Sequence, residues 1–363
     1  MELRYFIIRR LLLLIPTILG LTIFVFILMW AYGPANLVGP YLSQKGNRAA
    51  QIAYWENYLG IYPTDPVLTY FHYLGNLLSG NWGIVGGTFF LPFSNVLTDI
   101  EIFFPNTIQL AIGASILSIL IAIPLGTYVG SRPNSAVDSA ARIFSLSGYA
   151  MPAFWLAYLL ILLLGIGVSP IGFLGWTGNG LTLIPGAPSW QGITINGTPT
   201  ALTSPTHILI LDALLHGDLH LFLRGINFII LPVLTLTYGI LAGILRFVRA
   251  GMVDTSNQEF IKTARAKGVP ENIIIKKHIR KNALLPTVTV MGLLISGLLG
   301  GVVVVEEVFT YYGIGYLLVQ AATPSSLQVW LIMGSTIIFG IILVLTNLIV
   351  DIIYAYMDPR IRY

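Results

Sequence analysis

Three potential metal ligands, Asp212, His216 and His220, are spaced four residues apart. A continuous helix would stack them on one face, where together they could bind a metal ion. Gly217 lies inside the stretch and weakens such a helix, and no further strong ligand follows. We therefore interpret these residues as part of a solvated loop. The chain also has no cysteine, which excludes disulfides and Cys-type metal sites.

The sequence carries no local catalytic signature. No Gly is followed directly by Lys, so the chain has no P-loop, and neither H-E-x-x-H nor G-x-S-x-G occurs. Its Ser, His and Asp residues are scattered. We expect a non-catalytic protein that binds no cofactor or metal of its own.

The most informative stretch is instead a polar segment, 258–286, between the apolar segments 228–247 and 283–305. Each apolar segment is long enough to cross a bilayer, which takes about 20 residues. A basic cluster between two spans is typical of a cytoplasmic loop. Against Glu259 and Glu271, the segment carries seven basic residues: Lys262, Arg265, Lys267, Lys276, Lys277, Arg280 and Lys281.

The residue order in this segment predicts two helices. Residues 259–267 contain good helix formers and end at Gly268, a residue type suited to the position after a helix. Pro270 suits the start of a second helix. On the first helix, Phe260, Ala264 and Lys267 share a face. Such a helix, with one bulky apolar anchor and a small Ala, can lie close against another protein.

The composition agrees with a membrane protein. Of 363 residues, 56% are hydrophobic and 9% are charged, whereas soluble domains carry about 25% charged residues. The net charge of +4 does not indicate nucleic-acid binding, because the basic residues lie beside apolar spans.

Hydropathy predicts an all-α polytopic membrane protein with six transmembrane helices in the cell membrane. Sixteen of the nineteen Lys and Arg residues fall on one side if both termini are cytoplasmic, which favours that orientation. The Asn196 glycosylation sequon would then face outward. We divide the chain into 1–31 (N-terminal region and first span), 32–101 (extracytoplasmic subdomain), 102–168 (second and third spans), 169–227 (extracytoplasmic insertion), 228–250 (fourth span), 251–282 (cytoplasmic loop), 283–357 (fifth and sixth spans with an outer turn) and 358–363 (cytoplasmic C-terminus).

The predicted spans are nearly free of ionisable residues at their centres. Ion-coupled carriers usually place such groups near the middle of the membrane. This pattern favours an energy source outside the spans, and the basic loop is the obvious place to receive it. An ion-coupled secondary carrier that uses backbone carbonyls remains an alternative.

Several motifs resemble those of the permeases of ABC importers. The run KTARAKG, followed by NALLP, resembles their EAA loop, and in particular that of the dipeptide and oligopeptide permease B type in the peptide/nickel transport family. Lys262, Thr263 and Ala264 stand at the E-A-A positions, of which two differ, and Gly268 is at the signature glycine. MPAFWLAYLLIL, VVVVEEVFTYYGIGYLL and the final DPRIRY resemble further family segments, whereas residues 169–227 are not covered.

The resemblance implies a type I ABC-importer permease fold, in which the EAA loop is a coupling helix that docks on a cytoplasmic ATPase. It implies four partner chains: a second, homologous permease forming a heterodimer, two ABC ATPases that bind ATP and Mg, and an extracytoplasmic substrate-binding protein. The expected coupling residues are Glu259, Phe260, Ile261, Lys262, Thr263, Ala264, Arg265, Lys267 and Gly268. Polar groups near span ends are candidates for lining the pathway or for bonding between helices: Asn106, Gln109, Glu306 and Asn347.

The resemblance leaves the substrate open. It favours di- and oligopeptides, with oligosaccharides or nickel as alternatives for the same machinery. Aromatic residues in 32–101 are expected either as an interfacial belt or as part of a docking surface for the substrate-delivering protein.

Overall fold

The computed structural model describes residues 3–43, 45–86, 94–165, 194–195, 198–199, 206, 208–323 and 327–357. These residues are mostly helical, and the only regular strands among them are β1 (Thr194–Ile195) and β2 (Thr198–Pro199), which pair antiparallel. The expected C-terminal segment 358–363, most of the expected insertion 169–227 and Asn196 of the sequon lie outside the described residues.

Five described helices are long and apolar enough to cross a membrane, and a bent pair raises the number to six if it forms one span. They occur in the order of the predicted spans, and α5, α9 and α12 begin before residues 102, 228 and 283, where these spans were expected to start. The five are α1 (Leu3–Tyr32), α5 (Val96–Gly130), α9 (Leu219–Ser256), α12 (Arg280–Val308) and α14 (Val329–Met357).

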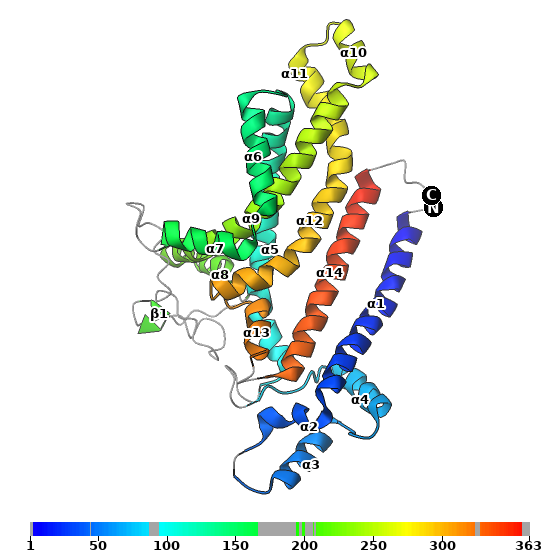
Figure 1. Cartoon of the computed structure of the whole chain (residues 1–363), viewed down its shortest axis with the longest axis vertical. Helices are drawn as coiled ribbons and strands as arrows, with labels where there is room; N and C mark the ends of the chain where they lie inside the picture. Colours follow the sequence, from blue (N-terminus) through cyan, green and yellow to red (C-terminus); the bar gives the residue numbers. More distant parts are fainter. Residues whose placement is uncertain are drawn as a thin grey trace.

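The third predicted span, within 102–168, is not a single straight helix. It consists of α6 (Ala136–Ala150) and α7 (Ala153–Leu160), bent by 108° at Met151 and Pro152, and a π-helical turn η2 (Ile161–Gly165) follows. Proline has no N–H to continue the hydrogen-bond ladder, and it disfavours a helical conformation for the preceding residue. Met151 is accordingly extended, with φ −85° and ψ 121°. In Figure 1, α7 lies crosswise to the long helices and projects from one side of the bundle.

Helix α9 packs along α5 through a strip of small residues. Ala114, Ser118, Ala122, Gly126 and Gly130 recur every four residues of α5 and are all fully buried. A Cβ atom on Gly126 or Gly130 would collide with Val248 or Met252 of α9. Because small residues let two backbones approach closely, this strip joins the two longest helices into a rigid pair.

Four short helices form a subdomain at the end of the molecule opposite α10 (Figure 1). They are α2 (Pro34–Leu37), η1 (Gly39–Tyr41), α3 (Arg48–Leu59) and α4 (Pro66–Leu78). Tyr73 links this subdomain to the spans, because its ring packs 6.2 Å from Phe26 and 6.0 Å from Trp330 between centroids. Tyr54 and Phe71 remain more than half exposed, so the subdomain keeps an open aromatic surface.

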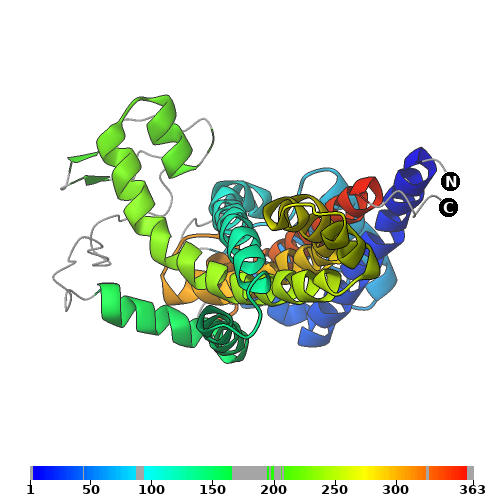
Figure 2. The same ribbon diagram turned by 90° about the horizontal axis from the view of Figure 1, so that it is seen from above.

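The first and last spans lie side by side. Arg10 of α1 forms a 2.9 Å ion pair with Asp351 of α14. Figure 1 places the start of α1 and the end of α14 in the same half of the molecule as the α5–α6 turn and α10. Seen from above in Figure 2, these two helices lie on one side of the bundle, and α7 and the start of α9 project on the other.

Candidate functional site

The candidate site is α10 (Glu259–Ala266), which projects from one end of the bundle between α9 and α12 (Figure 1). It begins after Gln258 and ends at Lys267, in agreement with the predicted helix. Gly268 follows with φ +74°, the left-handed conformation that glycine adopts without a steric penalty. The second predicted helix begins after Pro270 as α11 (Glu271–Ile273), but it continues through a π-helical turn, η4 (Ile274–Ile279), into α12.

Ile261 anchors α10 to the rest of the chain. Its side chain is fully buried and belongs to the same apolar cluster as Ile274 and Ile279 of η4 and Val248 and Met252 of α9. Ala264, one turn further along, is half-buried against this cluster. Ile261 therefore fixes the position of the helix from below rather than offering a contact to another protein.

The opposite face of α10 is open. Phe260 is 47% exposed, whereas the neighbouring Ile261 is fully buried. The other exposed residues of the expected coupling set are Glu259, Lys262, Thr263, Arg265, Lys267 and Gly268. Around the aromatic side chain the surface thus carries both charged and small polar groups.

Two ion pairs brace the segment at its surface. Lys262 Nζ lies 2.8 Å from Glu259 Oε1 within α10, and Arg265 donates two hydrogen bonds to Glu271 at the start of α11. The second pair closes the turn around Gly268. The hydrogen bonds with Glu271 raise the pKa of the Arg265 guanidinium above its ordinary value. Because both pairs are exposed, each contributes about 0–1 kcal/mol to stability and mainly sets the direction of the side chains.

The base of this segment is closely packed. A Cβ atom on Gly251 of α9 would lie 2.8 Å from the carbonyl oxygen of Ala283 in α12. Together with the tight contact of Gly130 with Met252, this ties α5, α9 and α12 together directly below α10. A force applied to α10 therefore reaches three spanning helices through packed backbone.

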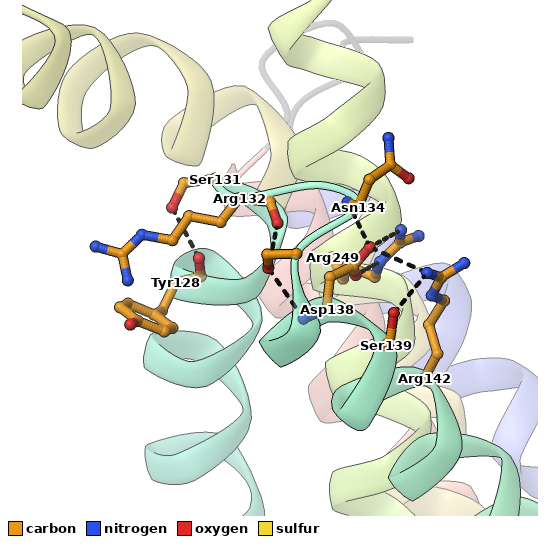
Figure 3. A network of polar contacts seen from close by, with 9 residues as sticks. Tyr128, Ser131, Arg132, Asn134, Asp138, Ser139, Arg142 and Arg249 are labelled. Carbon is orange, nitrogen blue, oxygen red and sulfur yellow. Dashed lines mark hydrogen bonds and ion pairs between the residues drawn. The ribbon is translucent and has the colours of Figure 1, made fainter.

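A buried ion pair, which the sequence analysis did not identify, joins the α5–α6 turn to α9. Asp138 at the start of α6 is fully buried, and Arg249 of α9 donates to both of its carboxylate oxygens, with Nη2 2.9 Å from Oδ2. The Asn134 backbone N–H donates to the same Oδ2 at 3.0 Å, and the Ser135 hydroxyl caps α6. Figure 3 shows these contacts together with Arg142, which lies 3.6 Å from Asp138.

At the other end of the bundle, two of the four expected pathway residues form hydrogen bonds that hold the segment after α12 against the spans. Glu306 of α12 is fully buried and accepts hydrogen bonds from Thr107 Oγ1 of α5 at 2.7 Å and from the Tyr316 backbone N–H at 3.0 Å. Asn106 donates to the Tyr312 carbonyl oxygen at 2.8 Å. A Cβ atom on Gly313 or Gly315 would collide with the Glu306 carboxylate, which explains the two glycines of this turn.

The other two pathway candidates differ from these. The amide oxygen of Gln109 is buried without a hydrogen-bond partner among the described residues. Asn347 of α14 is exposed. The structure therefore does not gather the four candidates into one site.

A cavity of about 290 Å³ lies where α6 bends into α7, and the sequence analysis did not identify it. It borders α9 and α12, and its walls include Tyr238, whose hydroxyl lies 2.8 Å from Ser147 Oγ. A Cβ atom on Gly239 or Gly297 would meet no atom within 4 Å, so these glycines leave the cavity open. Its lining carries no charged side chain: Gly148, Met151, Ala153, Leu156, Thr235, Leu236, Tyr238, Gly239, Ile240, Leu293, Leu294, Gly297, Leu298 and Gly301.

Asp212, His216 and His220 do not lie on one helix, and Asp212 is buried within a short helix rather than in the expected solvated loop. Helix α8 (Leu209–Leu215) ends before His216, Gly217 adopts φ +70°, and α9 begins at Leu219. Asp212 accepts hydrogen bonds from Thr206. Among the described residues, no group of three or more His, Cys, Asp or Glu side chains could hold a metal ion.

Comparison with known proteins identifies the family. The model of the binding-protein-dependent transport system inner membrane component family matches residues 122–363, which include α10, the buried ion pair and the cavity. The chain belongs to this family. It is therefore a membrane-embedded transport component, in agreement with its apolar helices.

Individual relatives match over nearly the whole chain. The oligopeptide transport system permease protein AppB of Bacillus subtilis is 36% identical over 99% of both chains. The dipeptide transport system permease proteins DppB of Haemophilus influenzae and of Escherichia coli are 32% and 29% identical, over 99% of this chain and 99% and 98% of their own. The matches therefore extend to residues 1–121, which the family model leaves out.

Proposed function

We propose that this chain is the permease subunit of an ATP-driven importer of di- and oligopeptides, forming half of the translocation pathway. The observation that carries the proposal is α10, a helix held from below by Ile261 and presenting Phe260 outward at the end of the bundle. Such an element suits transmission of force from another protein. The names of the relatives support peptides over oligosaccharides or nickel as the substrate.

The orientation belongs to the same proposal. Six spans, with α6 and α7 counted as one, and both termini in the cytoplasm give the type I permease arrangement. The distribution of Lys and Arg supports this, and so does the position of the start of α1 and the end of α14 in the half of the molecule that carries α10.

The proposed mechanism needs no catalytic group in this chain. Two ATPase subunits, which bind ATP and Mg, close on each other and move α10. Because α10 rests on closely packed α9 and α12, the spans rock as rigid bodies and open the pathway alternately to either side. A second, homologous permease would form the other half, and an extracytoplasmic binding protein would deliver the peptide.

The cavity at the α6–α7 bend is the best candidate for this chain's part of the pathway. Its uncharged lining would make few strong contacts with a particular side chain, which suits passage of varied peptides. Glu306 and Asn106, by contrast, would hold the outer turn in place through their hydrogen bonds.

Purification of the tagged chain from native membranes in mild detergent tests the proposal. We expect mass spectrometry to identify a second permease and P-loop ATPases, and the reconstituted complex to take up peptides only with ATP. Isolation of this chain alone, active in liposomes without ATP, would support the ion-coupled carrier instead.

A further inference from the structure

A second cavity lies between α6 and α9, near the buried ion pair of Figure 3. We call it the α6–α9 pocket. It has a volume of about 290 Å³ and combines positive and apolar walls. Its lining residues are Ala141, Arg142, Ser145 and Leu146 of α6 and Leu245, Arg246 and Arg249 of α9.

The pocket has an excess of positive charge. Of its three arginines, only Arg249 is fully engaged, because it donates to both oxygens of Asp138. Arg142 is 52% exposed, and its Nη2 donates to Ser139 Oγ at 3.2 Å and forms an ion pair with Asp138 Oδ2 at 3.6 Å. Arg246 is exposed and makes no hydrogen bond or ion pair with the described residues. The whole guanidinium group of Arg246 and the remaining N–H groups of Arg142 are therefore available for an anion.

Arg246 stands at the boundary of an uncharged run. Residues 225–245 of α9 carry no charged side chain and are followed directly by Arg246. A helix of that length covers about 31 Å, close to the thickness of the hydrocarbon core. Arg142 lines the same pocket as Arg246 and therefore lies at the same level. Both guanidinium groups thus fall at the level of the lipid headgroups, on the side of the bundle that carries α10.

An apolar surface leads away from the pocket into the level of the core. Ile143, Leu146 and Tyr149 on the outer face of α6 are 70%, 69% and 73% exposed. They follow Arg142 at helical spacing, so a headgroup held by the arginines would place its acyl chains along this face. The combination of a cationic pocket and an adjoining apolar strip matches the chemistry of a phospholipid.

We propose that the α6–α9 pocket binds an anionic glycerophospholipid. Arg142 and Arg246 hold its phosphate, and Asp138 keeps Arg249 in place beside them. Basic pockets between spanning helices on the cytoplasmic side are suited to such headgroups. The site would join α6 to α9 from outside, at the level where Asp138 and Arg249 join them inside.

The other basic cluster, Lys276, Lys277, Arg280 and Lys281, fits this role less well. Its cavity of about 490 Å³ is lined by a single helical segment, and Leu284 is its only apolar wall. It offers charge without a second helix to enclose a headgroup. This cluster is therefore an internal control for lipid binding at the pocket.

The test uses the purified intact transporter and phosphatidylglycerol, with zwitterionic phosphatidylcholine as the reference lipid. We expect native mass spectrometry to show retained phosphatidylglycerol, and the double variant R142Q/R246Q to lower that retention at least tenfold. R132Q/R280Q removes the same charge elsewhere and should retain the lipid. Unchanged retention in R142Q/R246Q, or an equal loss in the control variant, would overturn the proposal.

A photoactivatable phosphatidylglycerol tests the unmodified chain, which removes any dependence on the folding of the variants. We expect labelling of the peptide that contains residues 142–149. Labelling of residues 276–284 instead would overturn the site, as would labelling of neither. A crosslink from Leu146→Cys to the second permease would show that protein covers this face, and would overturn the site too.

Discussion

Two neighbouring residues of α10, Ile261 and Phe260, should respond in opposite ways to truncation. Both are large and apolar, but Ile261 is fully buried against α9 and η4, whereas Phe260 is 47% exposed. Replacement of a buried Ile by Ala removes its packing contacts and leaves a cavity. We expect Ile261→Ala to weaken the attachment of α10 by about 2–4 kcal/mol.

That loss has a measurable consequence for the local opening of the segment. A change of about 2–4 kcal/mol raises the population of the detached state roughly 30- to 900-fold. Amide hydrogen exchange reports such local opening. The amides of α10 and the Val269 N–H, which donates to the Ala264 carbonyl oxygen, should therefore exchange faster in Ile261→Ala, while those of α5 remain protected.

Phe260→Ala is the matched control. Because its side chain contributes little to the fold, exchange should stay within about threefold of the unmodified protein, in line with the small effect of most surface substitutions. Its cost should appear in association with the ATPase, measured by co-purification from the same membranes. Equal exchange in Ile261→Ala and the unmodified chain, or equal loosening by Phe260→Ala, would refute this assignment of the two faces.

Gly268→Ala should cost about 1–2 kcal/mol of local stability, because φ is +74° and not because a Cβ atom would be crowded. Gly268→Asn should cost less, since Asn tolerates this conformation better. Hydrogen exchange of α10 in both variants measures the difference, and equal effects would contradict this explanation. Asp138→Asn and Arg249→Gln should show a coupling of about 1–3 kcal/mol in a double-mutant cycle of detergent-induced unfolding, whereas additive effects would mean that the buried pair is not a unit. Gly297→Trp should fill the cavity at the α6–α7 bend and lower ATP-dependent uptake of longer peptides at least tenfold, while ATP hydrolysis is retained. The control is Gly20→Trp, at an equally open glycine of α1. Similar uptake in both variants would exclude the cavity as the pathway.

Local signals made α10 predictable. The helix formers, Gly268 and Pro270 occur in a run of a dozen residues, so their order alone indicated where the helix begins and ends. Local signals did not show which face of α10 is buried. The buried face depends on the π-helical turn Ile274–Ile279, which places Ile274 and Ile279 beneath Ile261.

Contacts between distant segments explain the features that the sequence analysis missed. Asp138 and Arg249 were visible as charged residues near span ends, but 110 residues separate them and nothing local pairs them. Pro152 was visible within the third predicted span, yet a proline can kink a helix slightly or break it, and the 108° bend depends on packing against α9 and α12. The cavity requires glycines from α6, α9 and α12 to meet, which no single stretch indicates.

Site-specific crosslinking tests whether the exposed face of α10 docks on an ATPase. The natural chain has no cysteine, so Phe260→Cys creates a single reactive thiol in an otherwise unmodified protein. A short thiol-directed photocrosslinker at this position should capture a P-loop ATPase, with a yield that changes when ATP is added. Leu78→Cys, at an 82% exposed position of α4, should capture none. Absence of an ATPase adduct at position 260 in a complex that imports peptides would contradict the account.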